Sequence, residues 1–202
     1  MTQENLWLRR LAEDPGHSQW YIERFRKMAA QGADLDGEAR MIDAMAGRGS
    51  RILDAGCGPG RLGGYLFRQG HQVVGVDLDP ALIAAAEVDH PGPLWLTGDL
   101  STLELTEPDG TPRRFDVIVC AGNVMTFCAP DTRGEILRRF RLHLAERGRV
   151  VIGFGAGRGY EVDDFLSDAV QAGLNADVLL STWDLRPFSP EDDFIVAVFS
   201  AT

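Results

Sequence analysis

The stretch ILDAGCGPGR, residues 52–61, constrains the fold of this chain more than any other feature. A short apolar run stops abruptly at Gly56. Two more glycines, Gly58 and Gly60, follow it, and a helix-like segment comes next. A strand that passes through a glycine loop into a helix is typical of doubly wound α/β folds, in which ligands bind at the carboxyl ends of the strands. Glycine permits positive φ and lets a ligand approach the backbone closely. The stretch therefore predicts a nucleotide-type ligand site, although a bare glycine loop can also be only a tight turn.

After residue 50 the chain alternates between apolar runs and amphipathic segments. The apolar runs predict strands at residues 51–55, 72–79, 93–100, 115–122, 149–155, 176–185 and 193–201. The segments between them predict helices at residues 61–70, 80–88, 131–148 and 161–173, with Gly148 as a helix C-cap. The last two strands are joined by RPFSPED, which is too short for a crossover helix, so we expect them to be antiparallel to each other. The alternation predicts a doubly wound α/β sheet with helices on both faces.

The first fifty residues have a different character from the rest. Apolar residues at helical spacing predict helices at 18–30, with Ser18 as the N-cap, and at 38–46. We expect residues 1–50 to form a helical cap segment near the ligand crevice and residues 51–202 to form the sheet, within one domain overall.

Composition narrows the range of partners. The chain has 202 residues, with 30 acidic against 20 basic side chains and a formal net charge of −10. Such a charge repels nucleic acid and anionic lipid, so we expect a small-molecule substrate and neither nucleic acid nor a membrane as partner. Three scattered cysteines and four scattered histidines predict no disulfide framework and no metal site. The charged N-terminal residues are unlike a secretory signal, and no apolar run reaches membrane-spanning length, so we expect a cytoplasmic protein.

Three aspartates decide which cofactor suits the loop. A dinucleotide fingerprint would place its third glycine where Arg61 stands. Asp77 lies 21 residues after Gly56, the spacing of a carboxylate that binds both ribose hydroxyls, although alone it could cap a helix. Asp99 could accept from an adenine amine or serve as a turn residue. Asp54 would repel a pyrophosphate but attract an ammonium group, so S-adenosylmethionine fits the loop better than NAD.

The four blocks RILDAGCGPGRLGGYL, VVGVDLDPALIAAA, LTGDL and FDVIVCAGNVMTF resemble, in order, the signature blocks of the class I S-adenosylmethionine-dependent methyltransferases. The resemblance covers roughly residues 50–155. It implies a Rossmann-like, seven-stranded, mostly parallel sheet with an antiparallel last strand. It also implies that the cofactor is bound by Asp54, Ala55, Gly56, Cys57, Gly58, Gly60, Asp77, Leu78, Asp99, Leu100, Ala121, Gly122 and Asn123.

The acceptor side carries weaker signals. Asn123 lacks the two prolines and the aromatic residue that follow this asparagine in amine methylases of DNA and of some proteins, which argues against methylation of base or amide nitrogen. Methyl transfer from a sulfonium is an in-line displacement that depends largely on alignment, and no residue identifies itself as a general base. Side chains expected near the acceptor are Trp20, Tyr21, Arg24, Tyr160 and Trp183. The alternatives are a non-catalytic S-adenosylmethionine-binding module and an NAD-dependent oxidoreductase.

Overall fold

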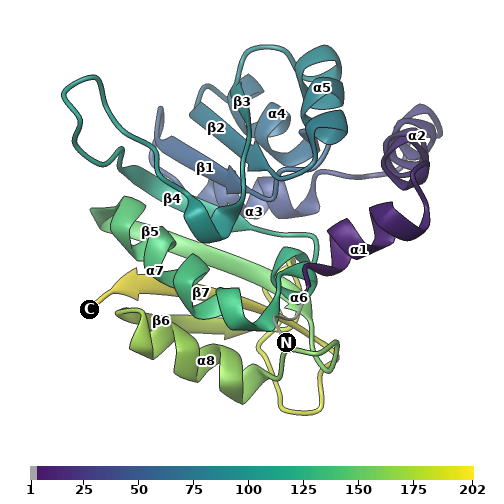
Figure 1. The fold of residues 1–202 in the computed structure, drawn as a ribbon. Coiled ribbons are helices and arrows are strands. Elements are labelled where there is room, and N and C mark those ends of the chain that lie inside the picture. The colour runs from purple at the N-terminus through teal and green to yellow at the C-terminus, as the bar shows by residue number, and fades with distance from the viewer. Residues whose placement is uncertain (1–3) are drawn as a thin grey trace.

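A seven-stranded sheet forms the centre of the computed structural model, which describes residues 4–202 (Figure 1). Its strands are β1 (Arg51–Ala55), β2 (Gln72–Asp77), β3 (Leu94–Thr97), β4 (Phe115–Cys120), β5 (Leu144–Gly155), β6 (Leu174–Leu180) and β7 (Phe194–Ala201). They lie in the order β3-β2-β1-β4-β5-β7-β6. The neighbours from β3 to β5 are parallel, and β7 runs antiparallel between β5 and β6. The predicted α/β sheet with its antiparallel last strand is confirmed.

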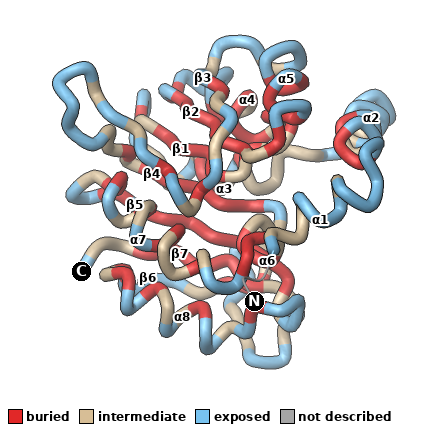
Figure 2. Tube along the Cα trace, in the orientation of Figure 1, coloured by how far each residue is buried: buried red, intermediate tan, exposed pale blue. Residues whose placement is uncertain are grey.

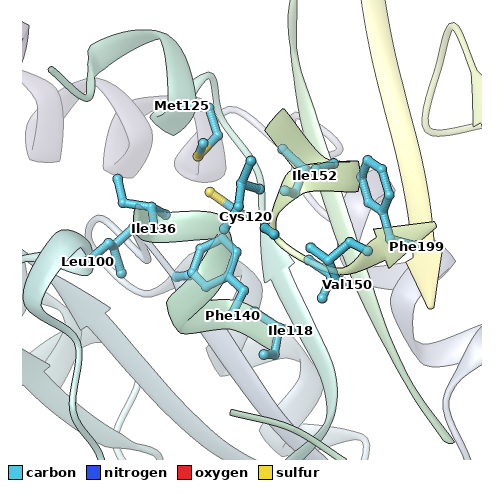
Figure 3. Close-up of a cluster of buried hydrophobic side chains, with 14 of the residues drawn as sticks. Leu100, Ile118, Cys120, Met125, Ile136, Phe140, Val150, Ile152 and Phe199 are labelled. Carbon is cyan, nitrogen blue, oxygen red and sulfur yellow. The ribbon is translucent and has the colours of Figure 1, made fainter. Parts of the chain in front are cut away.

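Helices cover both faces of this sheet. Those with the largest part in the two main cores are α3 (Gly37–Met45), α4 (Arg61–Arg68), α7 (Arg133–His143) and α8 (Val162–Gln171). Because successive strand residues point to opposite faces, Ile52 packs with α3 and α4, whereas Leu53 belongs to the core beneath α7 and α8. Figure 3 shows Ile118 and Cys120 of β4 near Phe140 of α7 in the latter core. The central strands are largely buried, whereas the edge strand β6 and the outer faces of the helices are largely exposed (Figure 2).

Two helices precede α3 and lie beyond the carboxyl ends of the strands. They are α1 (Leu6–Glu13) and α2 (His17–Ala30), and Figure 1 shows α1 beside α6 (Val124–Phe127). Helix α2 begins at His17 with Gly16 in the capping position, so the expected Ser18 cap is wrong; the Ser18 hydroxyl instead bonds outside its own helix. A further helix, α5 (Pro80–Asp89), packs against α2 and is capped by Asp79.

The helix predicted for residues 131–148 is shorter than expected. Helix α7 ends at His143, and β5 begins at Leu144, which pairs with Phe115 in a register that shifts before the main part of the strand. Gly148 is therefore part of a strand and does not cap a helix. A side chain at Gly148 would lie 2.9 Å from the Phe115 carbonyl oxygen, so close strand approach explains this glycine.

Candidate active site

A cavity of about 570 Å³ opens where the carboxyl ends of β1, β2 and β4 meet the N-terminal helices. Eleven of the thirteen residues predicted to bind a cofactor line it: Asp54, Gly56, Cys57, Gly58, Asp77, Leu78, Asp99, Leu100, Ala121, Gly122 and Asn123. The sheet topology explains this convergence, because parallel strands bring the loops that follow them to one edge.

Ala55 and Gly60 do not line the cavity. Ala55 is fully buried in the core of the sheet. Gly60 has a φ of 85°, and a side chain there would lie 2.7 Å from Ala86 of α5. Gly60 therefore allows the loop to pack on α5 rather than allowing a ligand to approach.

Asp54 is the most buried carboxylate of the cavity, with an exposed fraction of 2%. Its Oδ2 accepts a hydrogen bond from the Gly63 N–H, 2.9 Å away, in the first turn of α4. Within residues 4–202, Oδ1 has no hydrogen-bond donor. Burial raises the pKa of Asp54 to about 7. A cationic group that entered the cavity would favour the charged form of this carboxylate and gain a charge-assisted interaction.

Asp77 ends β2 and holds two turns together. Its Oδ2 accepts from the Gly58 N–H at 2.9 Å, and its Oδ1 accepts from the Asp79 N–H at 3.0 Å. Burial raises the pKa of Asp77 to about 6. Each carboxylate oxygen has a second lone pair, so Asp77 can still accept from hydroxyl groups in the cavity that it lines.

Asp99 is more exposed than the other two aspartates. It caps a short 3₁₀ helix, η1 (Leu100–Thr102), by accepting from the Ser101 N–H at 2.8 Å, and it lines the cavity as well. The sequence left open whether Asp99 serves as a turn residue or contacts a ligand. The Asp99 side chain can do both, because one oxygen caps η1 while the residue lines the cavity.

The loop after β4 has an unusual backbone. Gly122 and Asn123 both adopt left-handed conformations, with φ values of 72° and 68°. The conformation at Asn123 is tied to the end of β5, because its Oδ1 accepts from the Gly155 N–H at 2.7 Å. This bond orients the Asn123 amide at the cavity wall and fixes the start of α6.

A buried carboxylate attaches the N-terminal helices to the sheet. Asp79 Oδ2 accepts from Trp7 Nε1–H of α1 at 2.9 Å and from the Ser18 hydroxyl of α2, while Oδ1 accepts from the Ala81 N–H. The Asp79 backbone N–H in turn donates to Asp77. We call residues 6–30, which comprise α1 and α2, the helical cap. Asp79 therefore links the helical cap to the cavity: its side chain binds α1 and α2, and its backbone N–H binds Asp77.

This connection leads to a first prediction. Trp7→Phe keeps an aromatic ring but removes the Nε1–H donor to Asp79, so we expect cofactor affinity to fall about three- to tenfold, since one hydrogen bond contributes about 1 kcal/mol. Amide hydrogen exchange in α1 should also accelerate. Leu8→Ala, at an exposed position of the same helix, serves as the control. Unchanged affinity and exchange in Trp7→Phe would show that Asp79 does not connect the cap to the cavity.

The residues expected near the acceptor divide into two groups. Trp20, Tyr21 and Arg24 of α2 line the cavity. Tyr160 and Trp183 do not line it. Tyr160 is buried, stacks on Phe154 with ring centroids 5.6 Å apart, and donates its hydroxyl to Asp168. Trp183 is partly buried and packs over Gly153 against the core beneath α3 and α4.

Sequence reasoning missed several residues of the cavity wall. Trp7 and Arg10 of α1 and Arg158 after β5 all line it. The spacing of Trp7 and Arg10, one helical turn apart, places them on one face of α1 and was the signal available in the sequence. Nothing in the local sequence indicates that this face meets the sheet. Arg61, which breaks the dinucleotide fingerprint, forms a bidentate ion pair with Glu38 of α3 at 2.7 and 2.8 Å.

Within residues 4–202, no three or more histidine, cysteine or acidic side chains are grouped so that they could hold a metal ion. In the same part of the chain, no helix combines the length and the apolarity needed to span a bilayer.

Comparison with known proteins gives consistent matches. A family model described as a methyltransferase domain matches residues 52–148. The crystal structure of a TehB-like SAM-dependent methyltransferase from Corynebacterium glutamicum is 51% identical, with a TM-score of 0.88, and the match covers 94% of this chain and 100% of that one. The mouse 18S rRNA (guanine-N(7))-methyltransferase is 26% identical over 200 residues, which are 93% of this chain and 67% of that protein.

The name of a third relative indicates a different kind of acceptor. The malonyl-[acyl-carrier protein] O-methyltransferase of Pectobacterium atrosepticum is 29% identical over 141 residues, 68% of this chain. The match spans about half of that relative, 51% of its length.

Proposed function

The chain belongs to the S-adenosylmethionine-dependent methyltransferases, and we propose that this enzyme methylates a small-molecule acceptor held between the cofactor and the helical cap. The observation that carries the proposal is a single cavity lined both by the three aspartates of the strand ends and by aromatic side chains of α1 and α2. We further propose that residues 1–50, which include the helical cap, form an N-terminal segment beside the cofactor-binding part formed by residues 51–202, within one domain overall.

The residues at the strand ends fit this cofactor. Asp54 presents an oxygen without a donor to the cavity, which suits the ammonium group of the methionine moiety. Asp77 suits the ribose hydroxyls, and Asp99 with Leu78 and Leu100 suits the adenine. A side chain built onto Gly122 would meet no atom within 4 Å, so this backbone faces open space, as a ligand site requires. A buried carboxylate at Asp54 opposes a pyrophosphate, which argues against a dinucleotide.

When bound, the cofactor supplies an activated methyl group on a sulfonium. The protein then contributes mainly by alignment, which in favourable cases lowers the barrier by about 7–11 kcal/mol. Asn123, fixed by its bond to Gly155, forms the wall beside the expected position of the sulfur. The cap side chains Trp7, Trp20 and Tyr21 line the opposite side of the cavity.

Two features favour a small acceptor over a nucleic acid. The cap covers the cavity with α1 and α2, and the net charge of −10 repels a polyanion at long range. The rRNA-methylating relative makes the comparison with RNA necessary. Two parallel incubations test this proposal. The protein and methyl-labelled S-adenosylmethionine are mixed with a low-molecular-weight metabolite fraction in one, and with total rRNA in the other. Label in the metabolite fraction is expected. Label in the RNA alone would refute the small-molecule acceptor, and label in neither, with cofactor bound, would refute turnover.

The raised pKa values predict how cofactor binding depends on pH. The cation and the ribose hydroxyls favour the charged forms of Asp54 and Asp77, whose pKa values burial raises to about 7 and about 6. Binding therefore releases protons below pH 7, and affinity should rise as the pH increases from 5.5 to 8. Calorimetry at several pH values, in buffers of different ionisation enthalpy, measures both effects. Constant affinity and no proton release would contradict the assignment of these aspartates.

A further inference from the structure

We infer that the acceptor carries an oxyanion group, a carboxylate or a phosphate, and that Arg10 and Arg158 bind it. The inference rests on the proposed function, because it names the substrate class of the same site. It arises from the charges that line the acceptor side of the cavity.

The two arginines border a second, smaller space. A cavity of about 240 Å³ adjoins the main one and shares Arg10, Asn123, Phe127 and Arg158 with it. Since Asn123 forms the wall beside the expected reaction centre, a group in this smaller cavity would belong to the acceptor rather than to the cofactor.

Neither arginine is neutralised by a carboxylate of residues 4–202. In the described part of the chain, no carboxylate lies within ion-pair distance of Arg10 or Arg158, whereas Arg61 of the main cavity is paired with Glu38. The one carboxylate that lines the smaller cavity, Glu13, lies 3.9 Å from Arg9. Acidic residues outnumber basic ones in this chain, so the lack of an ion-pair partner for both guanidiniums within residues 4–202 does not reflect a shortage of carboxylates.

Packing positions both guanidiniums without using up their donors. The Arg10 guanidinium lies 6.0 Å from the centre of the Phe127 ring, in a cation–π arrangement. Arg158 lies over Gly155 at the end of β5, where a side chain on that glycine would come within 2.6 Å of Arg158 Nε. Arginine offers a planar set of donors that suits carboxylate and phosphate oxygens.

The cavity as a whole is electrically polarised. Its cofactor end carries Asp54, Asp77 and Asp99, which suit a cationic ligand, while Arg10 and Arg158 line the end that adjoins the smaller cavity. The other charged side chains of the wall are Arg24 and the ion-paired Asp34, Glu38 and Arg61. An anionic acceptor would be attracted to the second end and repelled from the first, so the charges would orient it relative to the methyl group.

Matched probes test the inference on the intact protein saturated with S-adenosylhomocysteine. Ligand-observed NMR titrations would compare benzoate with benzamide and phenyl phosphate with phenol, so that the two pairs distinguish carboxylate from phosphate. We expect at least one anion to bind tenfold or more tightly than its neutral partner. The double variant Arg10→Gln, Arg158→Gln should lose this preference. Arg68→Gln, which changes an exposed arginine at the end of α4, is the matched control.

Calorimetry of S-adenosylhomocysteine binding separates the possible failures. Both variants should bind it as the wild type does, because neither change touches the cofactor end. Normal binding with no preference for either anion, or with a preference that survives in the double variant, would overturn the anion site alone. Absence of binding to the wild type would instead refute the proposed function, and the anion site with it.

Discussion

Replacement of Asp77 by alanine is expected to lower the affinity for S-adenosylmethionine on the order of 100-fold or more, because two hydroxyl groups would lose a charged acceptor and each such bond contributes about 1.5–3 kcal/mol. Asp77 also accepts from the Gly58 and Asp79 N–H groups, so part of the loss would come from a looser loop. Isothermal titration calorimetry measures the change directly.

Two comparisons identify the source of the Asp77 effect. Methylthioadenosine contains the ribose but no amino-acid tail, so Asp77→Ala should weaken its binding as well. Asp99→Ala should cost far less, because Asp99 is exposed and one of its oxygens already caps η1. Asp89→Ala, which removes only a surface ion pair with Arg26, should leave affinity unchanged. If Asp77→Ala binds the cofactor like the wild type, the ribose assignment is wrong.

Asp54→Asn is expected to separate cofactor binding from stability. The amide can still accept from the Gly63 N–H but carries no charge, so affinity for S-adenosylmethionine should fall roughly 10- to 100-fold. Methylthioadenosine, which lacks the ammonium group, should bind the variant normally. Equal losses for both ligands would contradict the placement of the methionine moiety at Asp54.

The same substitution should stabilise the ligand-free protein at alkaline pH. Burial raises the pKa of Asp54 to about 7, above its value in the unfolded chain, so the folded state holds more protons between the two values. Stability therefore falls as the pH rises through this window, by up to about 4 kcal/mol. The asparagine amide has its own desolvation cost when buried, which offsets part of this gain in stability. We therefore expect the Tm of Asp54→Asn to exceed that of the wild type by roughly 3–6 °C at pH 8.

The stability effect has a pH signature and a control. Near pH 4 the wild-type carboxyl is neutral, so Asp54→Asn should then have almost no effect on Tm. The exposed Asp184, paired with Arg186 at 3.4 Å, should give almost no change at either pH when converted to asparagine. A lower Tm for Asp54→Asn at pH 8 would show that the charged carboxylate stabilises the empty site.

Local patterns were sufficient for most of the cofactor end. The order of apolar strand, glycine loop and helix depends on residues that are neighbours in sequence, and the spacing from Gly56 to Asp77 depends on one strand–helix–strand unit. Parallel pairing then brings the ends of β1, β2 and β4 together regardless of side-chain detail. This is why eleven of the thirteen predicted residues line the cavity.

The acceptor end could not be predicted in the same way. Tyr160 follows β5 at the correct edge of the sheet, yet packing against Phe154 and a bond to Asp168 turn it into the core. Arg158, two residues earlier, lines the cavity instead. Which of two nearby loop residues faces a ligand depends on contacts with elements distant in sequence.

The sequence by itself determined the fold class, the glycine loop and the identity of the aspartates at the strand ends, because these follow from local periodicity and from the geometry of parallel sheets. Only the tertiary structure decided that Asp79 holds α1 and α2 over the cavity and that burial raises the pKa of Asp54. It also decided that Arg10 and Arg158 line the same cavity, with no carboxylate of residues 4–202 paired to either. Burial, charge pairing and the orientation of the cap are set by contacts between residues far apart in the chain, which no local pattern specifies.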